Sequence, residues 1–278
     1  MANIEHLTKL KQGASGWLDW LDRSNQPAID LSNANLQKIN LAKVYLVKAN
    51  LTGADLTDAL LSYANLTGAN LQSAYLIGAD LSNANLIGSD LRFVEGRAAN
   101  FHSSNLIGTS LRQAQLRQAN FTEAKLNRAN LSETALTEAS FDRADLSRAN
   151  FFEAELQSAS FYQANLYRLS AIATHLNHGY LFACNLLEAN LTKCDLRWSN
   201  LSYANLQSAE LQYAKLRGTN LTKANLTGAN LSEANLRGTN FSKANLTKAN
   251  LTGADIEDTI FNKAKLTGTI MPDGTVHD

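Results

Sequence analysis

The side chains that most often carry out chemistry are few in this sequence. It contains five histidines (His6, His102, His175, His178 and His277) and two cysteines (Cys184 and Cys194). No cysteine accompanies a histidine at the spacing of a metal site, and no glycine-rich loop is arranged to hold a phosphate group. We therefore predict no catalytic residue, no metal site and no cofactor site, and we expect the protein not to be an enzyme.

The charge balance and the apolar content exclude further classes of function. The 278 residues include 25 Lys and Arg and 25 Asp and Glu, so the formal net charge at pH 7 is zero. Such a chain lacks the strong positive field of an obligate nucleic-acid binder and the strong negative field of a DNA mimic. No stretch reaches the roughly 18 consecutive apolar residues of a membrane span. We expect neither nucleic acid nor membrane as a partner. Two cysteines and no apolar run at the N-terminus predict a cytoplasmic protein.

A unit of five residues organises most of the chain. The frame runs from Leu31 to Leu266 through 48 consecutive pentapeptides without a shift. The central position is Leu, Phe or Ile in 46 of them, and Gly96 and Ala171 are the exceptions. Two residues earlier the side chain is Ala, Ser, Thr, Cys or Gly in 43 of the 48. A repeat this regular determines the architecture more strongly than local propensity does.

The spacing of the large and small residues predicts a coil. Residues two apart on an extended backbone point the same way, so the small residue and the central leucine share one face. A turn of two residues after each extended segment then returns the next pair to the inside. Ten of the 15 glycines lie two residues after the central position, where a type II turn requires a positive φ. Cys184 and Cys194 occupy the small inward position, half a coil apart, and are predicted to be core residues on opposite walls rather than a redox pair.

The phenylalanines give the length of one coil. Six of the seven central phenylalanines are separated by multiples of 20 residues, namely Phe101, Phe121, Phe141, Phe161, Phe241 and Phe261. Four pentapeptides therefore form one coil with four sides, and the phenylalanines stack on one wall. The repeat predicts about 12 such coils. Because none of the ten glycines lies on the phenylalanine wall, we expect a different turn type there.

The run A-(N/D)-L-x-x over residues 31–270 resembles the pentapeptide repeat family. The resemblance implies an all-β fold, the right-handed quadrilateral β-helix, in about 12 coils of 20 residues. The closing sequence LTGTIMPDGTVHD is similar to the C-terminus of cyanobacterial members, a regulator of heterocyst differentiation among them. The motif residues form the wall and the interior, so the resemblance says little about function.

Three segments follow from the repeat. Residues 1–28 are expected to be a helical cap, residues 29–270 the β-helix and residues 271–278 a C-terminal tail. Ile4, Leu7 and Leu10 have helical spacing, as do Trp17, Trp20 and Leu21. These helices either cover the first coil or form a partner-binding pair. Pro272, Asp273 and Gly274 predict a turn, and an exposed last coil would allow a monomer or a weak end-to-end homodimer.

The 20-residue coil also places surface residues in vertical columns. Three basic columns are expected: Arg128, Arg148 and Arg168; Arg197, Arg217 and Arg237; and Lys223, Lys243 and Lys263. Residues 211–270 hold eight Lys and Arg against four Asp and Glu. Either these long side chains are simply solvated, or the columns bind an acidic or other anionic partner surface.

Apolar and aromatic residues gather at outward positions between residues 151 and 198. The predicted vertical pairs are Phe152 with Ile172, Tyr162 with Phe182, Tyr167 with Leu187, and His178 with Trp198. The same segment departs from the repeat at Leu169, Ala171 and Gly179. Either a distorted coil covers these side chains with its own wall, or they form an exposed belt for a protein partner.

These patterns predict a non-enzymatic scaffold that binds a regulatory protein partner through its solenoid surface. The family resemblance implies a bacterial, and specifically cyanobacterial, source and a role in cell differentiation or signalling. Two alternatives stay open. One is inhibition of a type II topoisomerase (gyrase) by DNA mimicry, which the neutral charge disfavours. The other is a structural spacer whose length is its function.

Overall fold

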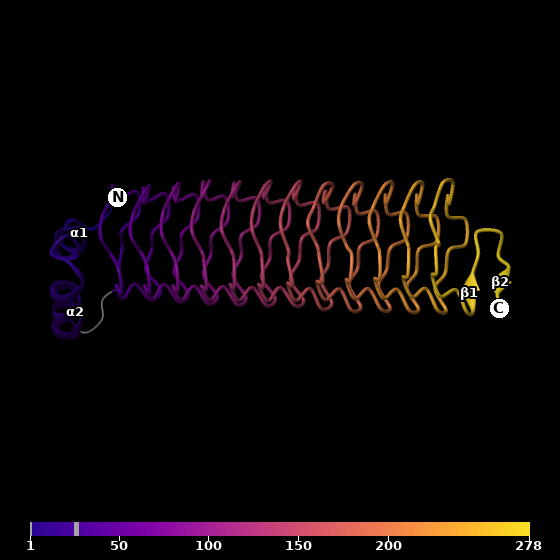
Figure 1. Ribbon diagram of the computed structural model, residues 1–278. Helices are drawn as coiled ribbons and strands as arrows, with labels where there is room; N and C mark the ends of the chain where they lie inside the picture. Colours follow the sequence, from indigo (N-terminus) through magenta and orange to yellow (C-terminus); the bar gives the residue numbers. More distant parts are fainter. Residues whose placement is uncertain (1, 25–27) are drawn as a thin grey trace. The chain divides into compact units, whose positions relative to one another are not determined.

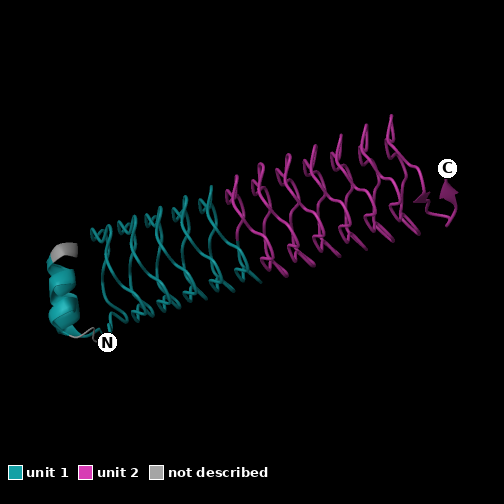
Figure 2. Cartoon of the chain, turned by 90° about the horizontal axis from the view of Figure 1, so that it is seen from below, with its two compact units in different colours: residues 1–135 teal, residues 136–278 magenta. Residues whose placement is uncertain are grey.

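The computed structural model describes residues 2–24 and 28–278. The chain divides into two compact units, residues 1–135 and 136–278, which Figure 2 shows in different colours. Among the described residues, no helix is both long enough and apolar enough to cross a membrane.

Two helices precede the repeats in the first unit (Figure 1). Helix α1 spans Ile4–Leu10 and helix α2 spans Ala14–Arg23. Asn3 begins α1 as its N-cap, because its side-chain oxygen accepts hydrogen bonds from the backbone N–H groups of Glu5 and His6 at 2.9 and 3.3 Å. Gly13 precedes α2 with a φ of 93°, a conformation that glycine adopts without steric cost.

The helices contact the first coil through specific hydrogen bonds. Trp17 is fully buried, and its indole Nε1 donates to the carbonyl oxygen of Tyr45 at 2.7 Å. The backbone N–H of Asn3 donates to the carbonyl oxygen of Asp30 at 3.0 Å, and the backbone N–H of Asp30 donates to His6 Nδ1 at 3.1 Å. Three backbone groups of the first coil, Tyr45 O, Asp30 O and Asp30 N–H, thus form hydrogen bonds with the N-terminal segment.

Both units are built from parallel bridges between residues 20 positions apart. In the first unit Asn50 pairs with Asn70, and in the second Asn205 pairs with Asn225. Bridges begin again every five residues, so one coil has four sides. The backbone N–H groups of Leu51 and Asn70 show the ladder, since they donate to Asn70 O and Ala49 O at 2.7 and 2.9 Å. The predicted coil of 20 residues is therefore confirmed within each unit.

Every pentapeptide ends in the same type of turn. In one example the N–H of Ala54 donates to the carbonyl oxygen of Leu51 at 3.0 Å, and Gly53 between them has a φ of 65°. A positive φ at this position is found in all 48 pentapeptides, including Ser103, Gln163 and Lys243 on the phenylalanine wall, whose φ values are 54°, 54° and 62°. The expected different turn type on that wall is wrong.

A side-chain hydrogen bond supports the turn in many pentapeptides, some with glycine and some with another residue at the positive φ. The Asn or Asp before the central residue accepts a bond from the backbone N–H two residues later, as Asn50 Oδ1 does from Thr52 at 3.2 Å. This Asx bond stabilises the turn whether or not glycine follows. The distribution of glycine consequently does not distinguish one wall from another.

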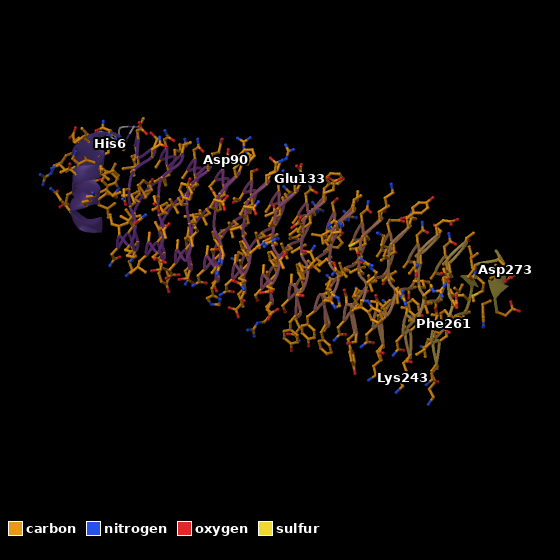
Figure 3. The ribbon with its side chains drawn as sticks, turned by 90° about the horizontal axis from the view of Figure 1, so that it is seen from above. His6, Asp90, Glu133, Lys243, Phe261 and Asp273 are labelled. Carbon is orange, nitrogen blue, oxygen red and sulfur yellow. The ribbon has the colours of Figure 1, made fainter. Side chains whose placement is uncertain are left out.

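The core is made by the central and small residues, as the repeat predicts. Leu51 and Ala49, for example, are both fully buried. Phe101 stacks on Phe121 with ring centroids 4.8 Å apart, and Phe241 stacks on Phe261 at 5.5 Å. In the second unit Phe141 stacks on Phe161 at 4.9 Å, and Phe151 meets Phe141 edge-on at 5.7 Å. Figure 3 labels Phe261 in the last coil.

Where the sequence departs from the repeat, a small side chain at one core position is compensated by a large side chain at a neighbouring core position. A Cβ atom on Gly96 would lie 2.7 Å from Leu116 Cδ2, so the Leu116 side chain occupies the space that Gly96 leaves. Leu169 and Ala171 are both buried, with the large residue at the small position and the small residue at the large one. The backbone keeps its bridges here, as Ser170 with Asn190 shows. The coil near residues 167–184 is therefore regular, not distorted.

The chain closes in a two-stranded antiparallel hairpin. Strand β1, Thr269–Ile270, pairs with strand β2, Val276–His277 (Figure 1). The turn predicted at residues 272–274 is confirmed, since the N–H of Gly274 donates to the carbonyl oxygen of Met271 at 2.9 Å and Gly274 has a φ of 85°. The side chain of Asp273 accepts from the N–H of Thr275 at 3.0 Å (Figure 3).

Candidate protein-interaction surface

The eight apolar positions of the expected belt lie on different sides of the coil. With a register of 20 residues, Phe152 shares a column with Ile172, whereas Tyr162 shares one with Phe182 half a coil away. The pair of Tyr167 and Leu187 and the pair of His178 and Trp198 occupy two further sides. The side chains of Phe152, His178 and Trp198 are exposed and the other five are half-buried. The structure divides the belt into four pairs, so one flat partner surface would not reach all of them.

One of these pairs belongs to a larger group, which we call the aromatic cluster: Tyr162, Tyr180, Phe182 and Tyr203. The ring of Phe182 lies 5.9 Å from Tyr162, 6.1 Å from Tyr180 and 5.3 Å from Tyr203, measured between centroids. Tyr162 and Tyr180 are 6.2 Å apart and nearly parallel. Tyr180 and Tyr203 are 41% and 51% exposed, so the cluster presents about half of its outer rings to solvent.

The repeat itself brings these rings together. Tyr180 and Phe182 flank the buried Leu181, so both leave the coil on the same edge. Tyr162 lies one coil before Phe182, and Tyr203 lies one coil and one residue after it. Sequence reasoning missed Tyr180 and Tyr203 because it compared only residues 20 apart. The residue two positions away in the same coil and the diagonal neighbour in the next coil carried the missing signal.

A column of lysines continues from the aromatic cluster. Tyr203, Lys223, Lys243 and Lys263 are spaced by 20 residues, and all four side chains are exposed. Lys223 Nζ lies 2.6 Å from the hydroxyl oxygen of Tyr203 and 4.7 Å from the centroid of its ring. Lys243 extends outward from the coil (Figure 3). We call Lys223, Lys243 and Lys263 the lysine column.

The arginine columns differ from the lysine column because several members are ion-paired. Arg168 Nε lies 2.6 Å from a carboxylate oxygen of Glu188. Arg197 and Arg237 lie 2.6 Å from carboxylate oxygens of Asp195 and Glu257, respectively. These carboxylates reduce the positive field of the predicted arginine columns.

The other three arginines of the predicted columns are exposed. Arg128 belongs to the first unit and Arg148 to the second. Arg217 lines a cavity of about 180 Å³ together with Trp198 and Arg237.

Trp198 leans toward the following coil. A Cβ atom built on Gly218 would lie 2.2 Å from Cε3 and Cζ3 of the Trp198 indole, so the ring covers the bare backbone of Gly218. Trp198 is nevertheless 55% exposed. The indole is thus held from one side and open to solvent on the other.

The pKa values of one carboxyl group and two thiols in this region are shifted by their surroundings. Burial acts to raise the pKa of Asp195, but hydrogen bonds from Arg197 and its positive charge outweigh burial and hold that pKa below its usual range. Burial raises the pKa of the Cys184 and Cys194 thiols, so both are held in the neutral form. Both cysteines are free and buried, as expected for core residues.

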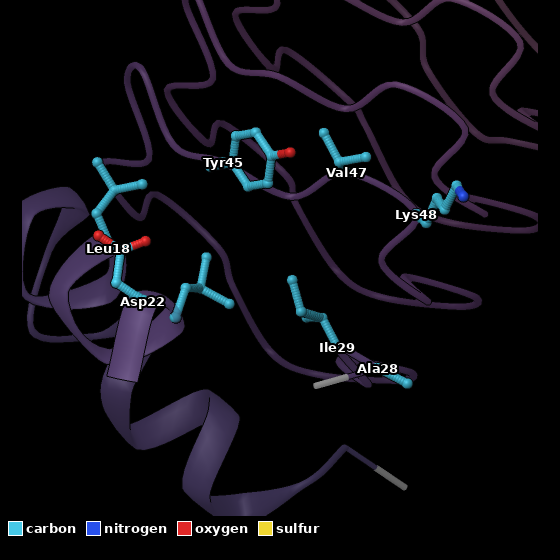
Figure 4. Close-up of a pocket in the computed structure, with 8 residues that line it drawn as sticks. Leu18, Asp22, Ala28, Ile29, Tyr45, Val47 and Lys48 are labelled. Atoms are coloured by element: carbon cyan, nitrogen blue, oxygen red, sulfur yellow. The ribbon is translucent and has the colours of Figure 1, made fainter. Parts of the chain in front are cut away.

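A cavity lies in the first unit, beside α2 (Figure 4). It has a volume of about 630 Å³ and a mainly apolar lining. Its lining residues are Leu18, Leu21, Asp22, Ala28, Ile29, Tyr45, Val47 and Lys48. Over residues 2–24 and 28–278, no three His, Cys, Asp or Glu side chains are grouped so that they could hold a metal ion.

Comparison with known proteins gives the family. The signature described as pentapeptide repeats matches in eight copies, over residues 28–62, 64–94, 97–132, 129–166, 189–228 and 229–268. The chain belongs to the pentapeptide repeat family. Proteins of this family adopt right-handed β-helix folds, so the predicted family and fold type are confirmed. No curated protein matches the chain in sequence.

Several solved structures of pentapeptide repeat proteins are similar to this chain. HetL from the cyanobacterium Nostoc sp. strain PCC 7120, involved in heterocyst differentiation regulation, is 31% identical, with 94% of this chain and 98% of HetL covered and a TM-score of 0.31. QnrB1, a plasmid-mediated fluoroquinolone resistance protein, is 22% identical over 69% of this chain and 88% of its own, with a TM-score of 0.42. Rfr23 from the cyanobacterium Cyanothece 51142 is 24% identical over 63% and 91%, with a TM-score of 0.16.

The pentapeptide repeat specifies the inward residues and leaves the candidate surface unspecified. The motif fixes the small and central positions, whereas the aromatic cluster and the lysine column occupy outward positions one or two residues from the central residue. The repeat motif therefore does not determine these side chains, and the fold alone does not give the function.

Proposed function

We propose that this pentapeptide repeat protein is a non-enzymatic interaction scaffold that binds a regulatory protein partner through the aromatic cluster. Proteins of the family are generally structural or interaction proteins. One observation carries the proposal: Phe182 has three aromatic neighbours, Tyr162, Tyr180 and Tyr203, with ring centroids 5.3–6.1 Å from its own, and two of the four side chains are more than 40% exposed. Clustered aromatic side chains at the surface are typical of binding hot spots.

The cluster has no evident role in holding the coil together. The inside of this coil is already filled by buried residues such as Leu181 and Phe161. Elsewhere the corresponding outward positions carry mostly polar side chains, for example Ser202 and Thr222 in the next two coils. Placing four rings where polar residues suffice for folding exposes apolar area to water, which favours a binding role for that area.

The cellular role is proposed from the resemblance to HetL, which is described as involved in heterocyst differentiation regulation. We place this protein in the same kind of process, in the cytoplasm of a cyanobacterium. Two buried free cysteines suit a reducing compartment. We further propose that the repeats form about 12 coils and that α1 and α2 cap the first of them, which the hydrogen bond between Trp17 and Tyr45 supports.

A matched pair of double variants tests the proposal. Full-length protein carrying Phe182→Ser and Tyr203→Ser removes the centre of the cluster. The control carries Phe152→Ser and Tyr213→Ser, which removes two exposed aromatic residues from the opposite side of the coil. Each protein is immobilised and exposed to an extract of the source cells. We expect a partner that wild type and the control retain and the cluster variant loses, with native circular dichroism for all three.

Retention of the same partner by all three proteins would contradict the proposed site. The two alternatives have weaker support. The lysine column and the neutral total charge are opposite to the acidic surface that DNA mimicry requires, and the likeness to QnrB1 is one of fold alone. A spacer would need no exposed aromatic cluster.

A further inference from the structure

The aromatic cluster and the lysine column form one continuous edge of the second unit. The contacts run from Tyr162 to Phe182, from Phe182 to Tyr203 and from Tyr203 to Lys223. The backbone ladder continues it, since the N–H of Lys223 donates to Ser242 O at 3.0 Å and the N–H of Lys243 donates to Asn262 O at 2.8 Å. We call this surface the aromatic–lysine edge.

Acidic residues are absent from the immediate surroundings of the lysine column. The three lysines lie in the segments TNLTKA (219–224), TNFSKA (239–244) and TIFNKA (259–264), which contain no Asp or Glu. In the part of the chain that the structure describes, no carboxylate lies within ion-pairing distance of these three lysines. Arg168, Arg197 and Arg237 have such carboxylates. The positive charges of the lysine column are therefore more available to a partner than those of these three arginines.

The geometry of the turns directs the three lysines the same way. Each is the third residue of its turn, with φ between 56° and 62°, and each side chain is exposed. Neighbouring coils are separated by about 4.8 Å, so the column spans about 10 Å. Three like charges at this spacing repel one another, and an anionic partner would relieve that repulsion.

We propose that the aromatic–lysine edge binds an acidic polypeptide segment that carries an aromatic or aliphatic side chain beside its carboxylates. The apolar side chain would pack against Phe182 and Tyr203, and the carboxylates would lie along the lysine column. The inference rests on the proposed function and names the chemistry of its partner. Charge complementarity fixes the acidic part, and the exposed rings next to Lys223 fix the apolar part.

A polypeptide suits this edge better than a nucleic acid does. Three lysines supply few phosphate contacts, and the whole chain carries no net positive charge. The inner rings stack on one another, with 16° between the planes of Tyr162 and Phe182 and 11° between those of Tyr180 and Phe182. Base stacking needs a ring face that is open, whereas an apolar side chain can pack against the exposed ring edges.

Fluorescence anisotropy with defined peptides tests the inference on the full-length protein. The first probe is a labelled peptide of six alternating Asp and Glu residues followed by Phe-Leu. In the second the acids are replaced by Asn and Gln, and in the third Phe-Leu is replaced by Ser-Ser. At low salt we expect the first probe to bind wild type at least about tenfold more tightly than the second and several-fold more tightly than the third.

Two charge-reversal variants identify the site. Lys223→Glu, Lys243→Glu and Lys263→Glu together should weaken binding of the first probe by about tenfold or more. The control reverses three exposed lysines outside the edge, Lys38→Glu and Lys125→Glu in the first unit and Lys193→Glu in the second, and changes the net charge by the same amount. It should alter the affinity by less than about twofold.

Three results would overturn the inference. They are no binding of the first probe to wild type, equal loss in both triple variants, and tighter binding of a single-stranded oligonucleotide than of the first probe. The proposed function can still stand in these cases: a partner lost from the Phe182→Ser, Tyr203→Ser variant but retained by the triple variant at residues 223, 243 and 263 would keep the site and refute its acidic ligand.

Discussion

A single glycine shows how closely this surface is fitted. Gly218 has a φ of 68°, and the Trp198 indole lies where its Cβ would be, at 2.2 Å. Gly238 occupies the equivalent position one coil later with a φ of 62°, and a Cβ there would meet nothing within 4 Å. The two glycines thus share one backbone conformation and differ in what faces them.

We predict that Gly218→Ala displaces the Trp198 ring, whereas Gly238→Ala does not. Both substitutions place an L side chain at positive φ, which costs about 1 kcal/mol. Gly218→Ala should cost about 1–3 kcal/mol more, because the ring must move away from the new methyl group. Thermal unfolding and tryptophan emission measure the two effects. Equal melting temperatures and unchanged emission in both variants would contradict the packing of Trp198 on Gly218.

At the scale of the elements, Trp17 joins helix α2 to the first coil. Its side chain is fully buried and donates to the carbonyl oxygen of Tyr45 at 2.7 Å. Trp20 stacks on it at 5.0 Å but is only half-buried, and its Nε1 donates to Glu5 within the helical pair at 3.1 Å. The two tryptophans therefore differ in burial and in whether the indole N–H donates to the repeats or to the helical pair.

We predict that Trp17→Ala loosens the first coil and that Trp20→Ala has a smaller effect. Removing a buried tryptophan costs about 3–5 kcal/mol, and Tyr45 O would also lose its donor. Hydrogen exchange of backbone amides in residues 29–50 should become faster in Trp17→Ala, and the free energy of unfolding should fall. Similar exchange in both variants would mean that the helices do not stabilise the coil.

The elements that follow from the repeat could be predicted from the sequence, because a period of five with leucine inward leaves one register. That register placed the phenylalanine stacks and the glycine turns correctly. The turn type failed as a prediction because residues other than glycine adopt the same positive φ, as Tyr63 does at 60°. Glycine is sufficient for the turn but is not necessary.

The candidate site could be predicted only in part. Tyr162 and Phe182 were found because they are 20 residues apart, but Tyr180 and Tyr203 join them as neighbours within a coil and across a diagonal. The direction in which a long side chain leans also decides contacts, as Trp198 over Gly218 shows. The direction of a side chain depends on the space that its neighbours leave, and the 20-residue spacing in the sequence does not give that space.

At the scale of the whole molecule, carboxylates with lowered pKa values occur in both units. The pKa of Asp30 is lowered by the backbone N–H of Ser32, which donates to it at 3.0 Å. Burial acts to raise the pKa of Asp90, and hydrogen bonds from Arg92 and Gln72 outweigh it; Asp195 behaves in the same way beside Arg197. Figure 3 labels Asp90. Each of these three carboxylates precedes a central leucine and accepts an Asx bond.

The sign of the resulting pH dependence follows from these lowered values. A carboxyl group whose pKa is lower in the folded protein binds fewer protons there than in the unfolded chain. Its contribution to stability is present above the unfolded pKa, which is about 3.9 for Asp, and is lost as the pH falls through the folded value. We therefore expect a nearly constant melting temperature between about pH 5 and pH 8 and a fall below about pH 4.

Asparagine variants isolate this effect, because asparagine already makes the same turn elsewhere in the chain. Asn235 Oδ1 accepts from the N–H of Arg237 at 3.2 Å, as Asp195 Oδ1 does from Arg197. The combination of Asp30→Asn, Asp90→Asn and Asp195→Asn should melt slightly below wild type at pH 7, and this difference should shrink as the pH falls below about 4, since the Asx acceptors of the variant do not titrate. A control with Asn in place of the exposed Asp19, Asp22 and Asp258 has the same net charge as the test variant. Its melting temperature should change with pH as that of wild type does. Parallel acid limbs for all three proteins would show that these Asx carboxylates do not govern acid stability.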